Sequence, residues 1–354
     1  MRRVDQLLPA LHQGDAIGDT ALHIKKILNS CGFSSQIYSL TIDEQLKPEA
    51  ELFSQFPTPS QADVVIFHFA LPSPLTEEVK RIPGKKIMIY HNITPSEFFI
   101  DYSSEMSFIS IEGRNQLKSL VSYIDLALAD SEFNKQELDA IGYRNTAVFS
   151  LFVDFNKYKK PINPSIYNLF NDDRVNILFV GRIVPNKKID EIIKVVFYYK
   201  KYISPLVRFI PVGKTISLPT YYHSLVRLAD EFLLKEEEII FTGHIPDEEL
   251  FAFYRVSDVF LSLSEHEGFC LPLIESMIFD LPIIAYNSTA VPYTLGRAGI
   301  LIKTKEIAYI AELINILVKN SHFQEKIITN QRKRLKEFKN QDLRGILIKY
   351  INNL

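Results

Sequence analysis

The string HEGFCLPLIES contains two glutamates, Glu267 and Glu275, which are separated by seven residues. An ionised carboxylate accepts hydrogen bonds from several hydroxyl groups, so such a pair suits a polyol. Gly268 predicts a turn, and Pro272 predicts the start of a helix, because its missing N–H costs nothing there. The helix dipole and the free N–H groups of that first turn would bind an anion such as a phosphate. The N–H groups concerned belong to Phe269, Cys270 and Leu271.

The elements around these glutamates read as strand, loop, helix and strand. The apolar run 259–263 predicts a strand buried on both faces, the helix runs to about Phe279, and 283–286 is the next strand. This is a parallel βαβ unit, and its loop lies at the carboxyl end of a strand, where open α/β sheets bind ligands. Glutamate in a first helical turn is also common simply because it offsets the dipole, so the pair alone decides nothing.

Length and composition set limits on the protein class. A chain of 354 residues suggests two domains, and 47% hydrophobic residues suffice for sizeable cores. The net charge of −2 gives no electrostatic reason to expect a nucleic-acid partner. The two cysteines, Cys31 and Cys270, suit a reducing cytoplasm and offer no metal-ligand spacing.

Membrane insertion is not expected. The N-terminal stretch MRRVDQLLPALHQGD has two arginines but too short an apolar run for a signal peptide. No segment approaches the ~20 apolar residues of a membrane span. We therefore expect a cytoplasmic location and leave attachment to the inner face of a membrane open.

Alternating strand and helix patterns occur twice along the chain. We predict a first domain at 1–153, a polar linker at 154–173, a second domain at 174–338 and a final helix at 339–354. The other predicted strands are 4–10, 36–40, 63–70, 86–90, 126–129, 147–153, 176–180, 207–213 and 239–243. The predicted helices include 20–29, 105–123, one capped by Ser131, 306–318, 323–338 and 341–353.

Three further loops carry polar residues at strand ends. The loop after 4–10 contains Gly14 and Gly18, which would let its backbone approach a ligand closely. His91 follows 86–90, and the segment GRIVPNKK, with Arg182 and Lys187, follows 176–180. Each has a plain alternative: an ordinary turn, a structural histidine, and a solvated basic turn before a helix.

The string EGFCLPLIE resembles the E-x7-E signature of the retaining GT-B glycosyltransferases of group 1, which are similar to glycosyltransferase family 4. This large family includes sucrose synthase and many bacterial hexosyltransferases. The segment from Gly181 to Lys187 resembles the family's G-R-x4-K, and HNITP and ADSEFN resemble two of its first-domain loops. NSTAVPYTLG resembles A-V-P-E-T-L-G, with Tyr293 in place of the usual glutamate, and Lys188 replaces a frequent glycine.

The resemblance implies an α/β protein of the GT-B fold, with two Rossmann-like domains facing across a cleft and the last helix returning to the first domain. It implies a retaining, metal-independent hexosyltransferase without a cofactor. The nucleotide-sugar donor would be UDP-glucose, with GDP-mannose next. The acceptor would be a saccharide or lipid-linked saccharide in polysaccharide or glycolipid synthesis.

The resemblance also assigns roles to residues. Arg182 and Lys187 would stabilise the leaving diphosphate, whose charge grows as the glycosidic bond breaks. Glu275 would hold the ribose, and His91 would orient the sugar. Glu267, with the amides of Phe269, Cys270 and Leu271, would hold the hexose and the diphosphate, and Gly268 would also contact the donor. Gly14, Asp15 and Ala16 would face the diphosphate, and His244 and Ile245 would contact the base through the main chain.

Other functions stay open. A nucleotide-sugar hydrolase or epimerase could use the same fold, and so could a catalytically silent nucleotide-sugar-binding protein. A dinucleotide dehydrogenase is disfavoured, because no G-x-G-x-x-G follows a strand. The absence of Asp-x-Asp argues against a metal-dependent donor site of the other glycosyltransferase architecture. The sequence does not fix the acceptor, the base, the linkage or the oligomeric state.

Overall fold

The computed structural model describes residues 2–354 and divides into two compact units. The first unit comprises Met1–Glu97, Glu105–Val153 and Gln341–Leu354, and the second comprises Phe98–Ser104 and Asp154–Asn340. Both are parallel-sheet α/β domains of the Rossmann-like type, so the predicted fold class is confirmed.

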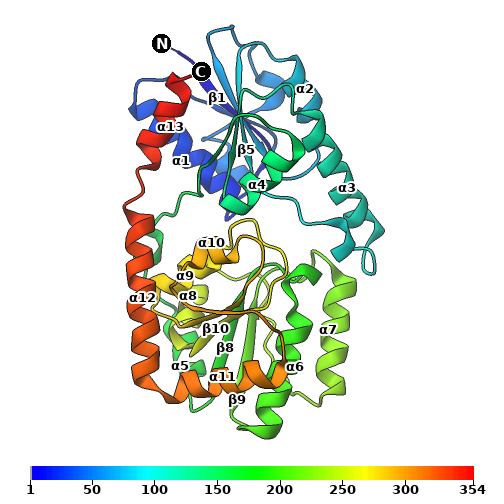
Figure 1. The fold of residues 1–354 in the computed structure, drawn as a ribbon, viewed down its shortest axis with the longest axis vertical. Helices are drawn as coiled ribbons and strands as arrows, with labels where there is room; N and C mark the ends of the chain where they lie inside the picture. Colours follow the sequence, from blue (N-terminus) through cyan, green and yellow to red (C-terminus); the bar gives the residue numbers. More distant parts are fainter. Residues whose placement is uncertain (1) are drawn as a thin grey trace. The chain divides into compact units, whose positions relative to one another are not determined.

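The first unit, in which Figure 1 labels β1 and β5, is built on a seven-stranded sheet in the order β3-β2-β1-β4-β5-β6-β7. All its strand pairs are parallel. The strand β4, which is fully buried, and β5, which is buried from Ile87 onward, come from the apolar runs that predicted them. The strands are β1 (Val4–Leu11), β2 (Ile37–Ile42), β3 (Glu51–Leu52), β4 (Val64–Phe69), β5 (Lys85–Tyr90), β6 (Leu126–Ala129) and β7 (Thr146–Val148).

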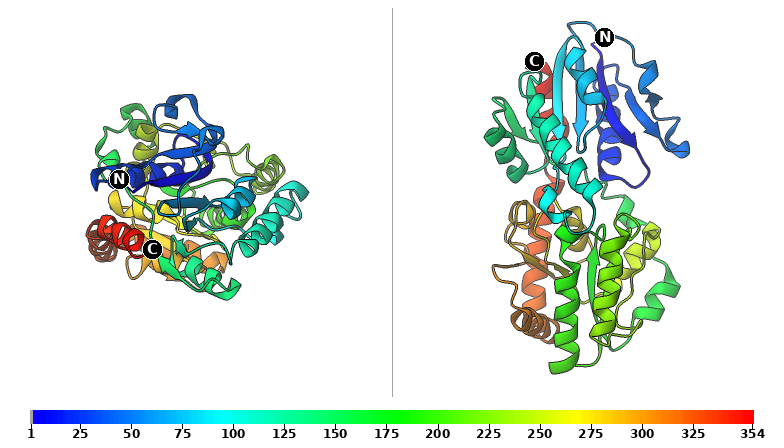
Figure 2. Two further views of the ribbon diagram at one scale, coloured as in Figure 1. Left: turned by 90° about the horizontal axis from the view of Figure 1, so that it is seen from above. Right: turned by 90° about the vertical axis from the view of Figure 1, so that its right-hand side faces the viewer.

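Helices cover both faces of this sheet (Figure 2). They are α1 (Ala16–Ser30), α2 (Leu75–Arg81), α3 (Ser104–Ser119), α4 (Glu132–Ile141) and α13 (Leu343–Asn352). The expected Ser131 cap is present, because its hydroxyl accepts from the Asn134 N–H at 3.2 Å. On one face, Leu347 and Ile351 of α13 pack with Val4 and Leu28 in a single buried cluster. The C-terminal helix is therefore part of the first unit.

The second unit has a five-stranded parallel sheet in the order β12-β11-β10-β8-β9. Its strands are β8 (Val175–Val180), β9 (Val207–Val212), β10 (Val259–Ser262), β11 (Ile283–Tyr286) and β12 (Ile300–Ile302). Its helices are α5 (Pro164–Phe170), α6 (Ile189–Tyr202), α7 (Pro219–Glu231), α8 (Asp247–Val256), α9 (Leu271–Ile278), α10 (Val291–Leu295), α11 (Ile307–Lys319) and α12 (Ser321–Lys339). Across residues 2–354, no helix is long and apolar enough to span a bilayer.

The strand predicted at 239–243 is only partly formed. Two isolated parallel bridges join this segment to β9, between Phe209 and Ile239 and between Val212 and Gly243. Pro211 lies between them on the outer edge of β9 and has no N–H to donate, so the ladder is interrupted there. The segment is extended but irregular, and the prediction of a regular strand is wrong for this physical reason.

The segment 154–173, expected as a linker, belongs to the second unit. It contains a short 3₁₀ helix at Lys157–Lys159 and the helix α5, which Asn163 caps by accepting from two backbone N–H groups. Tyr158 and Phe170 are buried. The prolines and asparagines that suggested a linker instead begin a helix, and the two aromatic side chains anchor the segment.

Each sheet has one point where the strand order reverses. In the second unit, β8 is followed in the chain by β9 on one side, and the chain then crosses to β10 on the other side. The reversal in the first unit lies between β1 and β4. Ligands of open α/β sheets bind outside the carboxyl ends of the strands at such points. The loops after β8 and β10 are therefore the first place to look for a site.

Candidate functional site

The loops after β8 and β10 are joined by direct hydrogen bonds. The side-chain amide of buried Asn186 donates to the main-chain carbonyl of His266 at 2.9 Å, and the main-chain carbonyl of Asn186 accepts from the Glu265 N–H at 2.8 Å. Thr289 accepts from the Glu267 N–H through its hydroxyl at 2.8 Å. These bonds bring the two predicted motifs, which lie far apart in the sequence, to one edge of the sheet.

Lys187 and Glu267 form an ion pair, with 2.6 Å between Nζ and Oε1. Their side chains are 15% and 9% exposed, so water screens the pair only weakly. Lys188 turns elsewhere and pairs with Glu265 at 3.2 Å. Burial raises the pKa of Glu265, but bonds and charges from Lys305 and Lys188 outweigh it and hold that pKa below its ordinary range. Of the two lysines, Lys187 is therefore the one that pairs with Glu267, the first glutamate of the motif.

Arg182 stands at the end of β8 with an exposed side chain. No hydrogen bond or ion pair occupies its guanidinium among the described residues. Behind it the strand ends are tightly packed: a Cβ on Gly213 would lie 1.9 Å from the carbonyl oxygen of Gly181. Gly213 also has φ of +153°, a value that L side chains rarely adopt. Glycine at this position lets β8 and β9 end side by side.

The helix α9 begins at Leu271, one residue before the expected start, so that Pro272 is its second residue. Cys270 precedes it in the left-handed conformation, with φ of +68° and ψ of +65°, which is uncommon for a residue with a side chain. Within residues 2–354, the backbone N–H groups of Gly268, Phe269, Cys270 and Leu271 donate to no protein acceptor. They are available to an anion at the amino end of α9.

The second motif glutamate lies inside the unit. Glu275 is 7% exposed, and its Oε1 and Oε2 accept hydrogen bonds from Tyr158 at 2.9 Å and from Tyr254 at 2.7 Å. Burial raises the pKa of Glu275, and the two tyrosine hydroxyls act in the opposite direction. Neither tyrosine was predicted as a partner of Glu275, and the bond to Tyr158 spans 117 positions of the chain.

The predicted base-contact residues follow the irregular segment beside β9. His244 is exposed and Ile245 is half-buried. The residue before them, Gly243, accepts from the Gly213 N–H through its carbonyl at 3.0 Å. Tyr293, the substituted position of the other motif, is 42% exposed on α10, and its carbonyl accepts from Arg334 at 2.6 Å.

In the first unit, the predicted residues Gly14, Asp15 and Ala16 lie at the start of α1, in the loop after β1. Gly14 has φ of +74°, which favours glycine, and Asp15 precedes the helix without capping it through its side chain. The close approach at Gly18 is to the chain itself, since a Cβ there would lie 3.2 Å from the carbonyl oxygen of His12. Gly18 therefore serves packing.

His91 is the predicted site residue whose surroundings differ most from the expectation. Its side chain is 2% exposed, Nδ1 is 2.9 Å from Asp130 Oδ2, and Nε2 is 3.0 Å from His68 Nδ1. His68 Nε2 is in turn 3.0 Å from the side-chain oxygen of Gln6. Both ring nitrogens of His91 are used within the first unit. The expected contact of His91 with the sugar stays a prediction, and in this arrangement the ring nitrogens bond Asp130 and His68.

The direction of these bonds fixes where the protons lie. The amide nitrogen of Gln6 donates to a carbonyl, so its oxygen accepts from His68 Nε2–H. Burial, followed by the charge of His91, lowers the pKa of His68 well below its ordinary value, so that ring is neutral. His68 Nδ1 must then accept from His91 Nε2–H. At the other end of the chain, burial raises the pKa of Asp130, whose Oδ2 lies 2.9 Å from His91 Nδ1.

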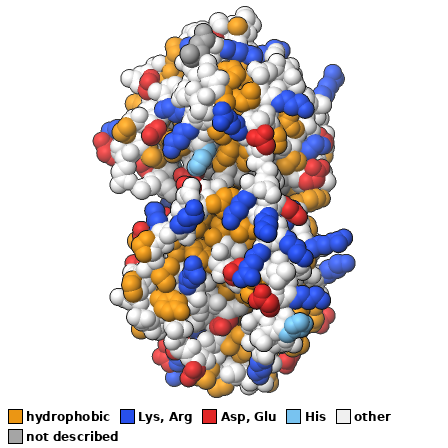
Figure 3. All heavy atoms as spheres, turned by 90° about the vertical axis from the view of Figure 1, so that its left-hand side faces the viewer, with side chains coloured by type: hydrophobic (Ala, Val, Ile, Leu, Met, Phe, Trp, Pro, Cys, Tyr) orange, Lys and Arg blue, Asp and Glu red, His pale blue; other side chains and the backbone are white. Residues whose placement is uncertain are grey.

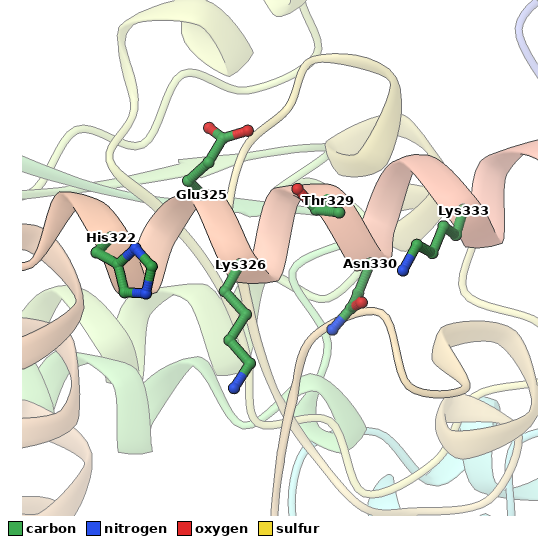
Figure 4. Close-up of a pocket in the computed structure, with 6 residues that line it drawn as sticks. All are labelled: His322, Glu325, Lys326, Thr329, Asn330 and Lys333. Atoms are coloured by element: carbon green, nitrogen blue, oxygen red, sulfur yellow. The ribbon is translucent and has the colours of Figure 1, made fainter.

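Other features are unrelated to this site. In the described part of the chain, no three histidine, cysteine or acidic side chains are grouped to hold a metal ion. The face that carries α12 is rich in lysine and arginine (Figure 3). An open hollow on this helix (Figure 4) is lined by His322, Glu325, Lys326, Thr329, Asn330 and Lys333. All six lie on one helix, away from the carboxyl ends of the strands.

The second unit resembles a known family of enzymes. Residues 165–334, a little under half of the chain, match the family model "Glycosyl transferases group 1". Among curated proteins, the chain is 25% identical over 236 residues to the serotype-specific mannosyltransferase WbdA of Escherichia coli. That alignment covers 61% of this chain but 27% of WbdA, so the chain spans about a quarter of that relative.

Two further similarities concern a curated protein and a solved structure. The O-antigen chain mannosyltransferase B of Escherichia coli is 28% identical over 104 residues, which are 29% of this chain and 27% of that protein. Among solved structures, Anabaena Alr3699/HepE in complex with UDP-glucose covers 100% of both chains, with a TM-score of 0.77 and 16% identity. At that identity the likeness shows the fold, which is GT-B.

Proposed function

We propose that this protein transfers a hexose from a nucleotide sugar to a hydroxyl acceptor, with retention and without a metal ion. The observation that carries the proposal is the arrangement at the β8–β10 reversal point. There the Lys187–Glu267 pair and the exposed Arg182 accompany four unbonded backbone N–H groups at the start of α9. Cations and N–H groups suit a diphosphate, and carboxylates suit sugar hydroxyls.

The proposed reaction exchanges one bond to the anomeric carbon for another on the same face of the sugar. The bond from that carbon to the diphosphate oxygen breaks, and a bond to the acceptor oxygen forms. The acceptor proton passes to the departing diphosphate oxygen, so no protein nucleophile is required. Arg182, Lys187 and the N–H groups at the start of α9 stabilise the charge that develops on the diphosphate. Glu267 and Glu275 bind hydroxyls of the hexose and the ribose.

Mannose and glucose are the two candidate donor sugars. The names of the two Escherichia coli relatives favour a mannosyl donor, such as GDP-mannose, over the UDP-glucose that family frequency favoured. Those names also support a growing surface polysaccharide as the acceptor. A thermal-shift screen would decide between the two donor sugars. It compares GDP-mannose, UDP-glucose, GDP and UDP, each in the presence of EDTA. A ligand at 100 times its Kd should stabilise the protein by about 2.7 kcal/mol.

The site assignment predicts the kinetics of two variants. Arg182→Ala and Lys187→Ala should each lower the transfer rate by about 10²–10³, because each loses a charged contact to the developing diphosphate. The measurement is release of nucleotide diphosphate with the donor found in the screen and a saccharide acceptor mixture, in EDTA. Lys326→Ala, on the distant face of α12, is the matched control and should keep the wild-type rate.

Four outcomes would contradict the proposal. Near-wild-type rates in both variants would remove the residues from the site. Loss of activity in EDTA with recovery in Mg²⁺ would overturn metal independence. Diphosphate release that does not depend on acceptor would indicate the hydrolase alternative. Binding of a nucleotide sugar without turnover on any acceptor would indicate a silent binding protein.

A further inference from the structure

Two tyrosines outside the E-x7-E motif hold the carboxylate of Glu275. Tyr254 lies on α8, and its ring stacks on Phe279 with 5.1 Å between centroids and 9° between planes. Tyr158 lies in the segment once expected to be a linker, with its ring 5.3 Å from that of Phe251. Tyr254 is 1% exposed and Tyr158 is 8% exposed. Packing therefore fixes both rings, and with them the positions of both hydroxyl groups.

The hydrogen bonds divide evenly over the carboxylate. Tyr158 donates to one oxygen and Tyr254 to the other. An ionised carboxylate offers about four lone-pair sites, two on each oxygen. On each oxygen, a tyrosine hydroxyl therefore occupies one lone-pair site, and one lone-pair site remains. Two adjacent hydroxyl groups, such as O2′ and O3′ of a ribose, match the two remaining sites.

We propose that Tyr158 and Tyr254 are positioning residues that fix the Glu275 carboxylate so that it grips both hydroxyls of the donor ribose. The inference rests on the proposed nucleotide-sugar site and adds two residues from elements outside its motifs. The competing account is a buried acid that the two tyrosines satisfy for stability alone. The two accounts differ in one respect: only a positioning role makes the tyrosine hydroxyls matter to ribose recognition.

The test measures affinity for GDP and UDP and for their 2′,3′-dideoxy forms by calorimetry. Wild-type protein should prefer the ribonucleotide by about tenfold or more, because hydroxyl bonds to a charged group are lost in the dideoxy form. Tyr158→Phe and Tyr254→Phe keep the rings and remove only the hydroxyls. Each should weaken ribonucleotide binding by about tenfold and leave dideoxynucleotide binding within about twofold. Glu275→Gln should likewise reduce the ribose preference.

The control is Tyr143→Phe, which removes a buried hydroxyl bonded to the Leu117 carbonyl in the first unit and should change neither affinity. Equal weakening of both nucleotide forms, or no change in either, would overturn the positioning role. A wild-type protein that binds nucleotide without ribose preference would overturn the inference and leave the proposed function standing. A wild-type protein that binds no nucleotide would overturn the proposed function and the inference together.

Discussion

At the scale of single residues, the buried chain from Gln6 through His68 and His91 to Asp130 controls how the first unit responds to acid. His68 can accept from His91 only while it is neutral. A proton on His68 Nδ1 would face the N–H of His91 and break the chain. The native state therefore resists protonation at His68, whereas the unfolded chain takes up a proton near the ordinary pKa of 6.5.

This difference in pKa predicts a pH dependence of stability. Because the unfolded state binds more protons below pH 6.5, the free energy of unfolding should fall there by up to about 1.4 kcal/mol per pH unit. Burial raises the pKa of Asp5 to about 6, and this group acts in the opposite direction, stabilising the native state as pH falls.

His68→Gln isolates the histidine contribution, because Asp5 is common to both proteins. Urea unfolding from pH 7.5 to pH 5 should give a steeper loss of stability in the wild type than in His68→Gln. Parallel curves would show that His68 does not set the response.

Part of the candidate site was predicted from the sequence. Lys187 and Glu267 were found because each sits in a short motif at a strand end, and the structure pairs them. Asn186, Tyr158 and Tyr254 were missed. Their bonds join segments that are distant in the sequence, and neither periodicity nor local spacing records such pairs. For Tyr158 a signal existed, because a large aromatic in a polar stretch can anchor that stretch to a core.

At the scale of elements, the strands buried on both faces were predictable, because a short continuous apolar run is typical of a strand that helices cover on both sides. The segment 239–243 has such a run but borders Pro211, which only the fold places beside it. The N-terminus of α1 at Ala16 lies four residues before the predicted start at Thr20. Residues 16–19 begin the helix without a side-chain cap, so the usual start signal was missing.

The helix α13 provides a test at this scale. Leu347 is fully buried in the cluster that also contains Val4 and Leu28. Leu347→Ala should destabilise the first unit by about 2–5 kcal/mol, through lost burial and a residual cavity. Lys349→Ala, on the exposed side of the same helix, should cost less than about 0.5 kcal/mol. Urea unfolding measures both, and similar values would show that α13 is not part of that core.

At the scale of the whole molecule, charge is nearly balanced. The chain has 40 basic and 42 acidic residues and 8 histidines, and its isoelectric point is about 6.5. Near that pH the net repulsion between molecules vanishes. We expect solubility to be lowest near pH 6.5 and to rise on either side, as polyethylene glycol precipitation across pH would show. A minimum elsewhere would mean that the charged groups titrate far from their ordinary values.

The assignment of residues 341–354 to the first unit has a consequence for synthesis on the ribosome. When the first 153 residues have emerged, the apolar cluster that α13 completes, which includes Val4 of β1 and Leu28 of α1, is still uncovered. The whole second unit must be translated before the covering helix exists. The nascent chain therefore exposes an apolar surface for that interval, the condition under which chaperones bind and chains aggregate. Translation speed through the second unit sets how long this exposure lasts.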